Sequence, residues 1–268
     1  MNDVISVAAI QMNCILGNKE ENLSKSERLI EDAVKKGAKL IVLPELFNTG
    51  YRVEENDLDL AEQIPGETTS WLERICSENN VYIVGCILEK SITNGVIYDT
   101  AIVVGPKGLI GSYRKIHLWD KENIRFAKGN EYPIFDLGFA RLGVQICYEI
   151  GFPEGARILS LKGADIVVYP SAFGKERLYV WDIATRSRAL ENGIYVIACN
   201  RTGKERGKTE FGGFSRIVDP KGKIIVEASS EDEVILAEVN LNDVKNQRRE
   251  VPYLRDLNQC VIKENLIF

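Results

Sequence analysis

Apolar residues gather along the chain in short runs that contain almost no polar residue. Four such runs lie at residues 40–43, 81–84, 166–169 and 194–198. Runs of this length without alternation are typical of strands that are buried on both faces, as in parallel sheets covered by helices. Residues 1–10 have the same character and no basic segment, so they predict a first strand and not a signal peptide.

Between these runs, apolar residues recur at helical spacing. Residues 23–37 present one apolar face and end at a glycine, and residues 71–76 present another. Pro153 suits the first turn of a third helix, and residues 178–190 mark a fourth. The expected apolar side of the third helix consists of Ile158, Leu159 and Leu161. The expected apolar positions of the fourth helix are Leu178, Trp181, Ile183, Ala184, Ala189 and Leu190.

The chain contains an internal repeat. The segment GAKLIVLPELF at residues 37–47 matches GADIVVYPSAF at residues 163–173. Two later pairs of segments repeat in the same order, so each half has a strand, a helix, a strand, a helix and then strands joined by a Pro-containing turn. No linker rich in Ser, Gly or Pro divides the halves. We therefore predict one domain over residues 1–268, built as a pseudo-symmetric α/β sandwich.

Three polar residues stand at the ends of predicted strands: Glu45, Lys115 and Cys147. A carboxylate, an ammonium and a thiol placed in this way are the components of a nucleophilic hydrolase. At a strand-to-helix bend we expect the thiol to face solvent and to be favoured as a thiolate by nearby helix N–H groups. The alternatives are a buried structural cysteine and a solvated loop glutamate. Glu45 aligns with Ser171 in the repeat, so this strand end does not require an acid.

Composition excludes several classes of function. The net charge is −5, which argues against a nucleic-acid partner, and no apolar run approaches the roughly 20 residues of a membrane span. The six cysteines are scattered without a CxxC pair, which favours reduced thiols and a cytoplasmic setting. The single histidine, His117, excludes a His-rich zinc site, and we expect it to be structural.

Three motifs occur in the order IVLPELF at residues 41–47, YRKIHL at residues 113–118 and GVQICYE at residues 143–149. With this ordered set the chain resembles the nitrilase superfamily of carbon–nitrogen hydrolases, over roughly residues 4 to 250. The resemblance implies a four-layer α-β-β-α sandwich that forms an αββααββα assembly on dimerisation. The helix after Cys147 and the helix at residues 181–192 would form the dimer face. The tail, about residues 245–268, would pack across the dimer.

The resemblance also implies a triad of Glu45, Lys115 and Cys147 without a histidine, and a further catalytic glutamate. Glu122 fits that place, and Glu131 is its nearest competitor. No cofactor and no metal are implied. The expected substrate contacts are Tyr148, Tyr51, Ser171 and Phe173.

The expected reaction converts a small carboxamide to a carboxylate and ammonia through a thioester on Cys147. Glu45 would serve as base and then as acid, with a pKa raised by burial. The alternatives are an N-carbamoyl amine or amino-acid hydrolase, an ω-amidase, a nitrilase, or a non-catalytic scaffold, which the complete triad disfavours. An anionic substrate would need an arginine in the pocket, and Arg201 and Arg177 are the candidates.

Overall fold

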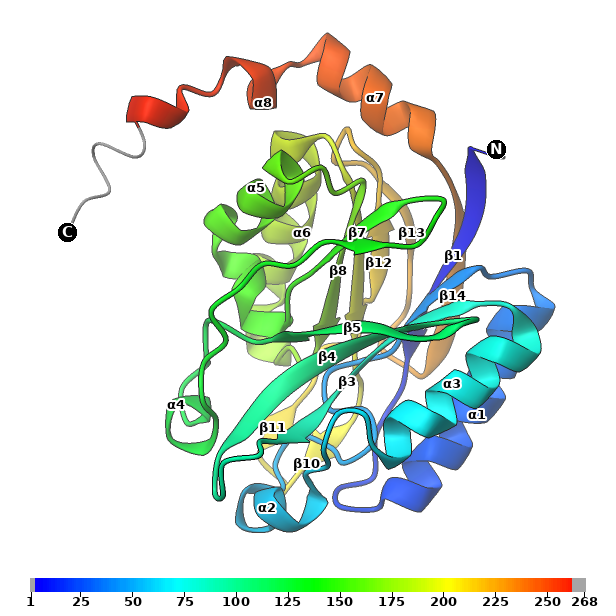
Figure 1. The fold of residues 1–268 in the computed structure, drawn as a ribbon, viewed down its shortest axis with the longest axis vertical. Coiled ribbons are helices and arrows are strands. Elements are labelled where there is room, and N and C mark those ends of the chain that lie inside the picture. The colour runs from blue at the N-terminus through cyan, green and yellow to red at the C-terminus, as the bar shows by residue number, and fades with distance from the viewer. Residues whose placement is uncertain (1–2, 262–268) are drawn as a thin grey trace.

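Two six-stranded sheets stack face to face in the computed structural model, which describes residues 3–261 (Figure 1). The first sheet has the order β14-β1-β2-β3-β4-β5 and consists of β14 (Glu233–Asn240), β1 (Val4–Gln11), β2 (Leu40–Val42), β3 (Tyr82–Lys90), β4 (Ile97–Gly105) and β5 (Gly108–Arg114). The second has the order β13-β12-β9-β8-β7-β6 and consists of β13 (Ile224–Glu227), β12 (Arg216–Val218), β9 (Tyr195–Asn200), β8 (Ile166–Ser171), β7 (Arg141–Val144) and β6 (Phe135–Asp136). A small hairpin pairs β10 (Lys204–Glu205) with β11 (Thr209–Glu210).

Helices cover the outer face of each sheet (Figure 1). The first sheet is covered by α1 (Lys19–Lys35) and α3 (Glu67–Asn79), and the second by α5 (Pro153–Leu161) and α6 (Leu178–Asn192). Other helices are the short α2 (Asp57–Leu60) and α4 (Glu122–Arg125), followed near the C-terminus by α7 (Leu241–Glu250) and α8 (Tyr253–Asp256). The layers are therefore α-β-β-α, which confirms the sandwich predicted from the repeat and the layer order that the resemblance implied.

Strand β1 shows how the sequence produces two buried layers. Val7 and Ala9 pack between the sheets, while Ala8 and Ile10 face the helices α1 and α3. All four side chains are fully buried. Successive side chains of a strand point to opposite faces, so a strand covered on both sides needs an apolar residue at every position.

The predicted internal repeat is present in the topology. In the first sheet β1, β2 and β3 are parallel, and in the second β7, β8 and β9 are parallel. Each parallel trio is extended on both sides by antiparallel strands, with β14 and β6 on one side and β4 and β12 on the other. Strand β2 is thus the counterpart of β8, which makes the residues after these two strands structurally equivalent.

The expected apolar sides of α5 and α6 were partly wrong. Leu159 of α5 is buried, but Ile158 and Leu161 are more than a third exposed. In α6 Trp181, Ala184 and Ala189 are buried, whereas Ile183 and Leu190 face outward. Each of these helices carries apolar residues on two faces. The second sheet covers the inner face, and the outer face is left exposed.

The C-terminal segment leaves the sandwich after β14. Helices α7 and α8 run along one end of the molecule (Figure 1). Of the predicted tail at residues 245–268, residues 262–268 lie outside the described part. No helix in residues 3–261 is both long and apolar enough to cross a bilayer.

Candidate active site

The structure brings together the three residues that the sequence placed at strand ends. Glu45 follows β2, Lys115 directly follows β5, and Cys147 opens a short 3-10 turn, Cys147–Gly151, just beyond β7. Lys115 Nζ lies 2.6 Å from Glu45 Oε1. Glu45 and Lys115 both act on the pKa of the Cys147 thiol, so the thiol lies close to both groups. A thiol, a carboxylate and an ammonium therefore form one cluster between the two sheets.

Lys115 lies at the centre of three carboxylates. Its Nζ is 2.6 Å from Glu45, 2.9 Å from Glu122 and 3.4 Å from Asp99. Burial alone would lower the pKa of Lys115, but the charges of Glu122, Glu45 and Asp99 together outweigh it and raise the pKa well above its ordinary value. Lys115 is therefore a permanent cation. Among residues 3–261 these three acids are the only group whose ligand atoms cluster closely enough for a metal ion, and the Lys115 ammonium already neutralises part of their charge.

Both carboxylate oxygens of Glu45 are held by fixed donors. Oε1 accepts from Lys115, and Oε2 accepts from the backbone N–H of Ala172 at 2.7 Å. Burial raises the pKa of Glu45, Lys115 lowers it, and Asp99 raises it further, so that the pKa rises to about 7. A carboxyl group with this pKa can accept and return a proton near neutral pH. The donor at Ala172 comes from the end of β8, which is the counterpart of β2 in the internal repeat. The end of one repeated strand therefore orients the glutamate that follows the other.

Asp99 is a member of this cluster that the sequence reasoning missed. It lies in β4, is fully buried, and its Oδ1 accepts a hydrogen bond from the Cys86 thiol at 2.9 Å. Burial is the largest cause of its raised pKa. A signal was present, because Asp99 interrupts a strand whose remaining residues are mostly apolar, and a buried carboxylate needs a cationic or hydrogen-bonding partner.

The exposure and the protonation state of Cys147 differ from those expected from the sequence. Only 7% of the residue is exposed, and burial together with the charge of Glu45 raises the pKa of its thiol well above the usual value despite Lys115. The expected solvent-facing thiolate is wrong: the resting group is a thiol that needs a base. Cys147 has φ 49°, in the left-handed region. This conformation costs a non-glycine residue about 1–2 kcal/mol, and here it holds the thiol at a sharp bend.

Glu149 holds the Cys147 turn against the segment that follows Lys115. Its buried carboxylate accepts hydrogen bonds from the Tyr113 hydroxyl at 2.7 Å and from the backbone N–H groups of Ile116 and Ile146 at 3.0 and 2.7 Å. The sequence reasoning gave Glu149 no role of its own. One carboxylate thus joins both neighbouring strand ends and fixes the spacing between the ammonium and the thiol.

Glu122, at the first turn of α4, is placed as expected and its competitor Glu131 is not. The Glu122 carboxylate accepts from the Tyr51 hydroxyl at 2.6 Å and from the Trp119 N–H at 2.7 Å, in addition to its contact with Lys115. Glu131 is exposed. Burial is the largest cause of the raised pKa of Glu122. Tyr51 therefore acts on the cluster through Glu122.

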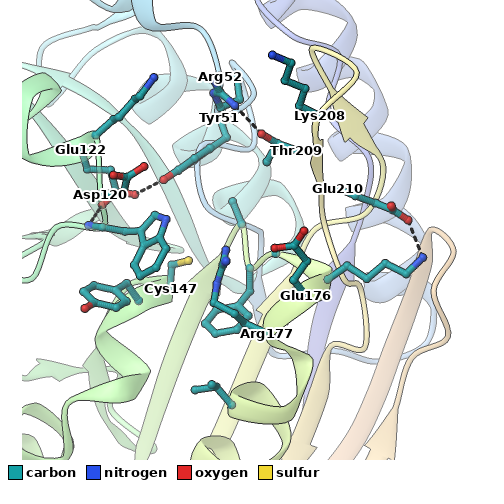
Figure 2. A pocket seen from close by; sticks show the side chains of 18 of the residues that line it. Tyr51, Arg52, Asp120, Glu122, Cys147, Glu176, Arg177, Lys208, Thr209 and Glu210 are labelled. Carbon is teal, nitrogen blue, oxygen red and sulfur yellow. Dashed lines mark hydrogen bonds and ion pairs between the residues drawn. The ribbon is translucent and has the colours of Figure 1, made fainter.

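A cavity of about 850 Å³ opens over Cys147. Tyr51, Tyr148 and Phe173, three of the expected substrate contacts, line it together with Cys147 and Glu122. Figure 2 shows Tyr51 and Glu122 on the same side of this cavity, joined by their hydrogen bond.

Ser171 is not part of the cavity wall, so its expected substrate contact is not supported. It is fully buried, and its hydroxyl donates to the carbonyl of Tyr169 at 3.0 Å. The neighbouring residue, Ala172, lines the cavity instead. His117 also lies outside the wall, where its ring stacks on Phe152 at 3.9 Å between centroids.

The fold and the buried thiol–carboxylate–ammonium cluster define a hydrolase of carbon–nitrogen bonds. The model of the carbon-nitrogen hydrolase family matches residues 6–249, and the chain belongs to this family.

Similar proteins support the same assignment. The chain is 44% identical over 263 residues to a nitrilase of Pyrococcus abyssi (strain GE5 / Orsay), covering 95% of each chain. It is 36% identical over 248 residues to the omega-amidase NIT2 of Xenopus tropicalis, covering 88% of this chain and 89% of the other. Among solved structures it resembles Nit3 of Saccharomyces cerevisiae, a member of branch 10 of the nitrilase superfamily, with a TM-score of 0.88, 32% identity and 96% coverage of both chains.

Proposed function

We propose that the protein is an amidase that hydrolyses a small carboxamide to a carboxylate and ammonia through a thioester on Cys147. The observation that carries the proposal is the position of Glu45. Its carboxylate pairs with the ammonium of Lys115 at 2.6 Å and acts on the pKa of the Cys147 thiol, and its own pKa is about 7. A base with this pKa can take the proton of a buried thiol and later release it to a leaving group.

In the first half-reaction the Cys147 proton moves to Glu45 while the sulfur forms a bond to the amide carbon. The carbonyl oxygen becomes an oxyanion that accepts hydrogen bonds from the Lys115 ammonium and the backbone N–H of Tyr148. Tyr148 is the second residue of its 3-10 turn, where N–H groups have no partner within the turn. Each such donor contributes about 3–4 kcal/mol to transition-state stabilisation. Glu45 then protonates the amide nitrogen, the C–N bond breaks and ammonia leaves.

In the second half-reaction Glu45 takes a proton from water, and the hydroxide attacks the thioester carbon. The same donors hold the second oxyanion. The C–S bond breaks, the proton returns from Glu45 to sulfur, and the carboxylic acid is released. Glu122 acts by orienting Lys115, because it contacts Nζ at 2.9 Å and is itself fixed by Tyr51.

The nature of the amide is tested by a panel of compounds. Purified protein is incubated with carboxamides, ω-amides of dicarboxylic acids, N-carbamoyl compounds and nitriles, and the ammonia and the acid product are both quantified. We expect carboxamides to give ammonia and carboxylate in equal amounts. Hydroxylamine should divert part of the acyl group to a hydroxamic acid, because it competes with water for the thioester. Ammonia release from N-carbamoyl compounds alone, or from nitriles alone, would mean that the protein is an N-carbamoyl hydrolase or a nitrilase and not an amidase. No ammonia release from any compound would contradict the proposal that the protein is a hydrolase.

The pH dependence of kcat/KM is expected to depend on Asp99. Glu45 must be ionised to accept the thiol proton, so activity should rise as the pH rises through the pKa of Glu45, about 7. This rise is the acid limb of the pH profile. Asp99 is one of the groups that raise the pKa of Glu45, so Asp99→Asn should move the acid limb to lower pH, by about one unit. The measurement is kcat/KM for one carboxamide between about pH 5 and 9.

Asp57→Asn provides the control, because Asp57 is also buried but pairs with Arg125 at 2.7 Å and not with Lys115. It should leave the midpoint of the acid limb in place. An acid limb that is unmoved in Asp99→Asn would show that Asp99 does not couple to the base.

We also propose that the enzyme works in the cytoplasm as a homodimer or a higher homo-oligomer. All six cysteines are free thiols, which suits a reducing compartment. The outward residues of α5 and α6 include Tyr179 and Ile183, which are 69% and 64% exposed. Large apolar side chains at this exposure favour a helix-to-helix contact between two copies, with the layers αββααββα. The C-terminal segment after residue 245 would pack across that contact.

A further inference from the structure

Arg177 presents a guanidinium to the cavity that contains Cys147. It ends the short 3-10 helix Lys175–Arg177, and its guanidinium carbon lies 4.7 Å from the centroid of the Trp119 ring. Figure 2 shows Arg177 and Cys147 directed into the same cavity. A Cβ atom at Gly174 would come within 2.6 Å of the Arg177 Nη2, so the glycine leaves the space that the guanidinium occupies.

The other arginines near the cavity are already neutralised. Arg52 forms an ion pair with Glu54, and Arg125 pairs with Asp57 at 2.7 Å. Arg201, the other candidate from the sequence, does not line the cavity; it is fully buried and paired with Glu205. Within residues 3–261, Arg177 has no carboxylate at ion-pairing distance, so of the three arginines in the wall it alone has a free charge.

We propose that Arg177 binds a carboxylate at the far end of the substrate, so that the enzyme selects small amides that are anionic. A guanidinium is planar and binds a carboxylate through two parallel hydrogen bonds, and stacking on an aromatic ring fixes its plane without using these donors. The inference rests on the proposed amidase function and names the substrate class of the same site.

The neighbouring charges of the wall define the competing outcome. Glu176 also lines the cavity and is exposed, and in Figure 2 it lies beside Arg177. A cationic amide would be attracted to Glu176 and repelled by Arg177. Lys208, at the same cavity, is exposed on the β10–β11 hairpin and has no ring beneath it. Arg125 also lies over a ring, that of Phe126 at 4.5 Å, but it is paired with Asp57. Among the charges of the wall in residues 3–261, Arg177 is thus the one that lies over a ring and has no ion-pair partner.

The experiment compares amides of one length that differ in their far end. Ammonia release is measured as kcat/KM for succinic acid monoamide, for uncharged butyramide and for cationic 4-aminobutyramide. The fourth compound, N-carbamoylglycine, also carries a carboxylate at its far end, but it is a ureido acid. Comparing it with succinic acid monoamide shows which of the two kinds of anionic substrate the enzyme prefers. We expect the native enzyme to prefer an anionic compound. In Arg177→Met the ratio of kcat/KM for the anionic to the uncharged amide should fall about 100-fold, mainly through KM.

Two further variants make the outcome specific. Arg177→Lys keeps the charge and should restore part of the ratio, whereas Lys208→Met removes a rim charge and should change the ratio by less than about threefold. A native preference for butyramide or the cationic amide would overturn the proposal, as would an equal loss for all compounds in Arg177→Met. Turnover of butyramide with no anionic preference would refute the carboxylate site and leave the amidase function standing. If no compound releases ammonia, both the carboxylate site and the amidase function are contradicted.

Discussion

Replacing Cys147 with alanine is expected to lower kcat/KM for ammonia release at least about 10⁴-fold. The proposed reaction has no other acyl acceptor, because the thioester forms on the Cys147 sulfur. What remains after the substitution is the weak catalysis that Lys115 and Glu45 give to direct attack by water. The measurement is ammonia release with the best substrate of the panel, at enzyme concentrations high enough to detect the residual rate.

Cys260→Ala is the matched control, because Cys260 is the exposed free thiol of the chain. It should retain activity, and hydroxylamine should yield hydroxamic acid with this variant but not with Cys147→Ala. A thermal unfolding curve for each variant separates loss of chemistry from loss of fold. Ammonia release from Cys147→Ala at near-native rate would mean that the thiol is a buried structural cysteine, the alternative that the sequence left open.

The sequence was sufficient to group the main residues of the candidate site because they stand at the ends of strands. Glu45, Lys115 and Cys147 each follow an apolar run, and the two sheets place these ends against each other. The repeat also identified the end of β8 as the equivalent of the Glu45 strand end. It did not predict that Ala172, and not Ser171, would serve the site, because this depends on which backbone N–H faces Glu45 across the two sheets.

Protonation states were harder to predict than positions. The thiolate expected at Cys147 followed from the local bend, but its pKa is set by burial and by two carboxylates that come from distant segments, Glu45 and Glu122. Asp99 was missed for the same reason. It lies 54 residues from Glu45 in the sequence, and only the pairing of β4 with β3 and β5 brings it to Lys115.

The apolar residues of α5 and α6 show a different limit. A helical pattern gives the number of apolar residues on each face, but it does not say which partner covers them. Leu159 and Ile158 are adjacent in α5, and one is buried against the sheet while the other faces outward. The sequence pattern therefore assigned to the core of one chain the outward residues that we propose to contact a second copy.

Glu45→Gln is expected to lower kcat about 10³- to 10⁴-fold, at the upper end of the effect of a general acid–base group. Glutamine keeps an oxygen acceptor for Lys115 or Ala172 but cannot take the thiol proton, protonate the amide nitrogen or activate water. Because the pKa of the Cys147 thiol is well above its ordinary value, hardly any thiolate forms without Glu45. The variant should therefore also lose the rise of activity near pH 7, and its residual rate should increase only at alkaline pH, where hydroxide replaces the base.

The rate of Cys147 alkylation by iodoacetamide provides a second measurement that needs no substrate. It should fall in Glu45→Gln, since alkylation also requires the thiolate. Glu62→Gln is the control: Glu62 lies in the same half of the chain, is mostly buried and pairs with Lys19 at 3.0 Å, away from the cluster. If Glu45→Gln retains the acid limb and the native alkylation rate, Glu45 is not the base. The remaining carboxylates near Lys115, Glu122 and Asp99, would then have to supply that function, because burial holds the thiol in its protonated form until a neighbouring group removes the proton.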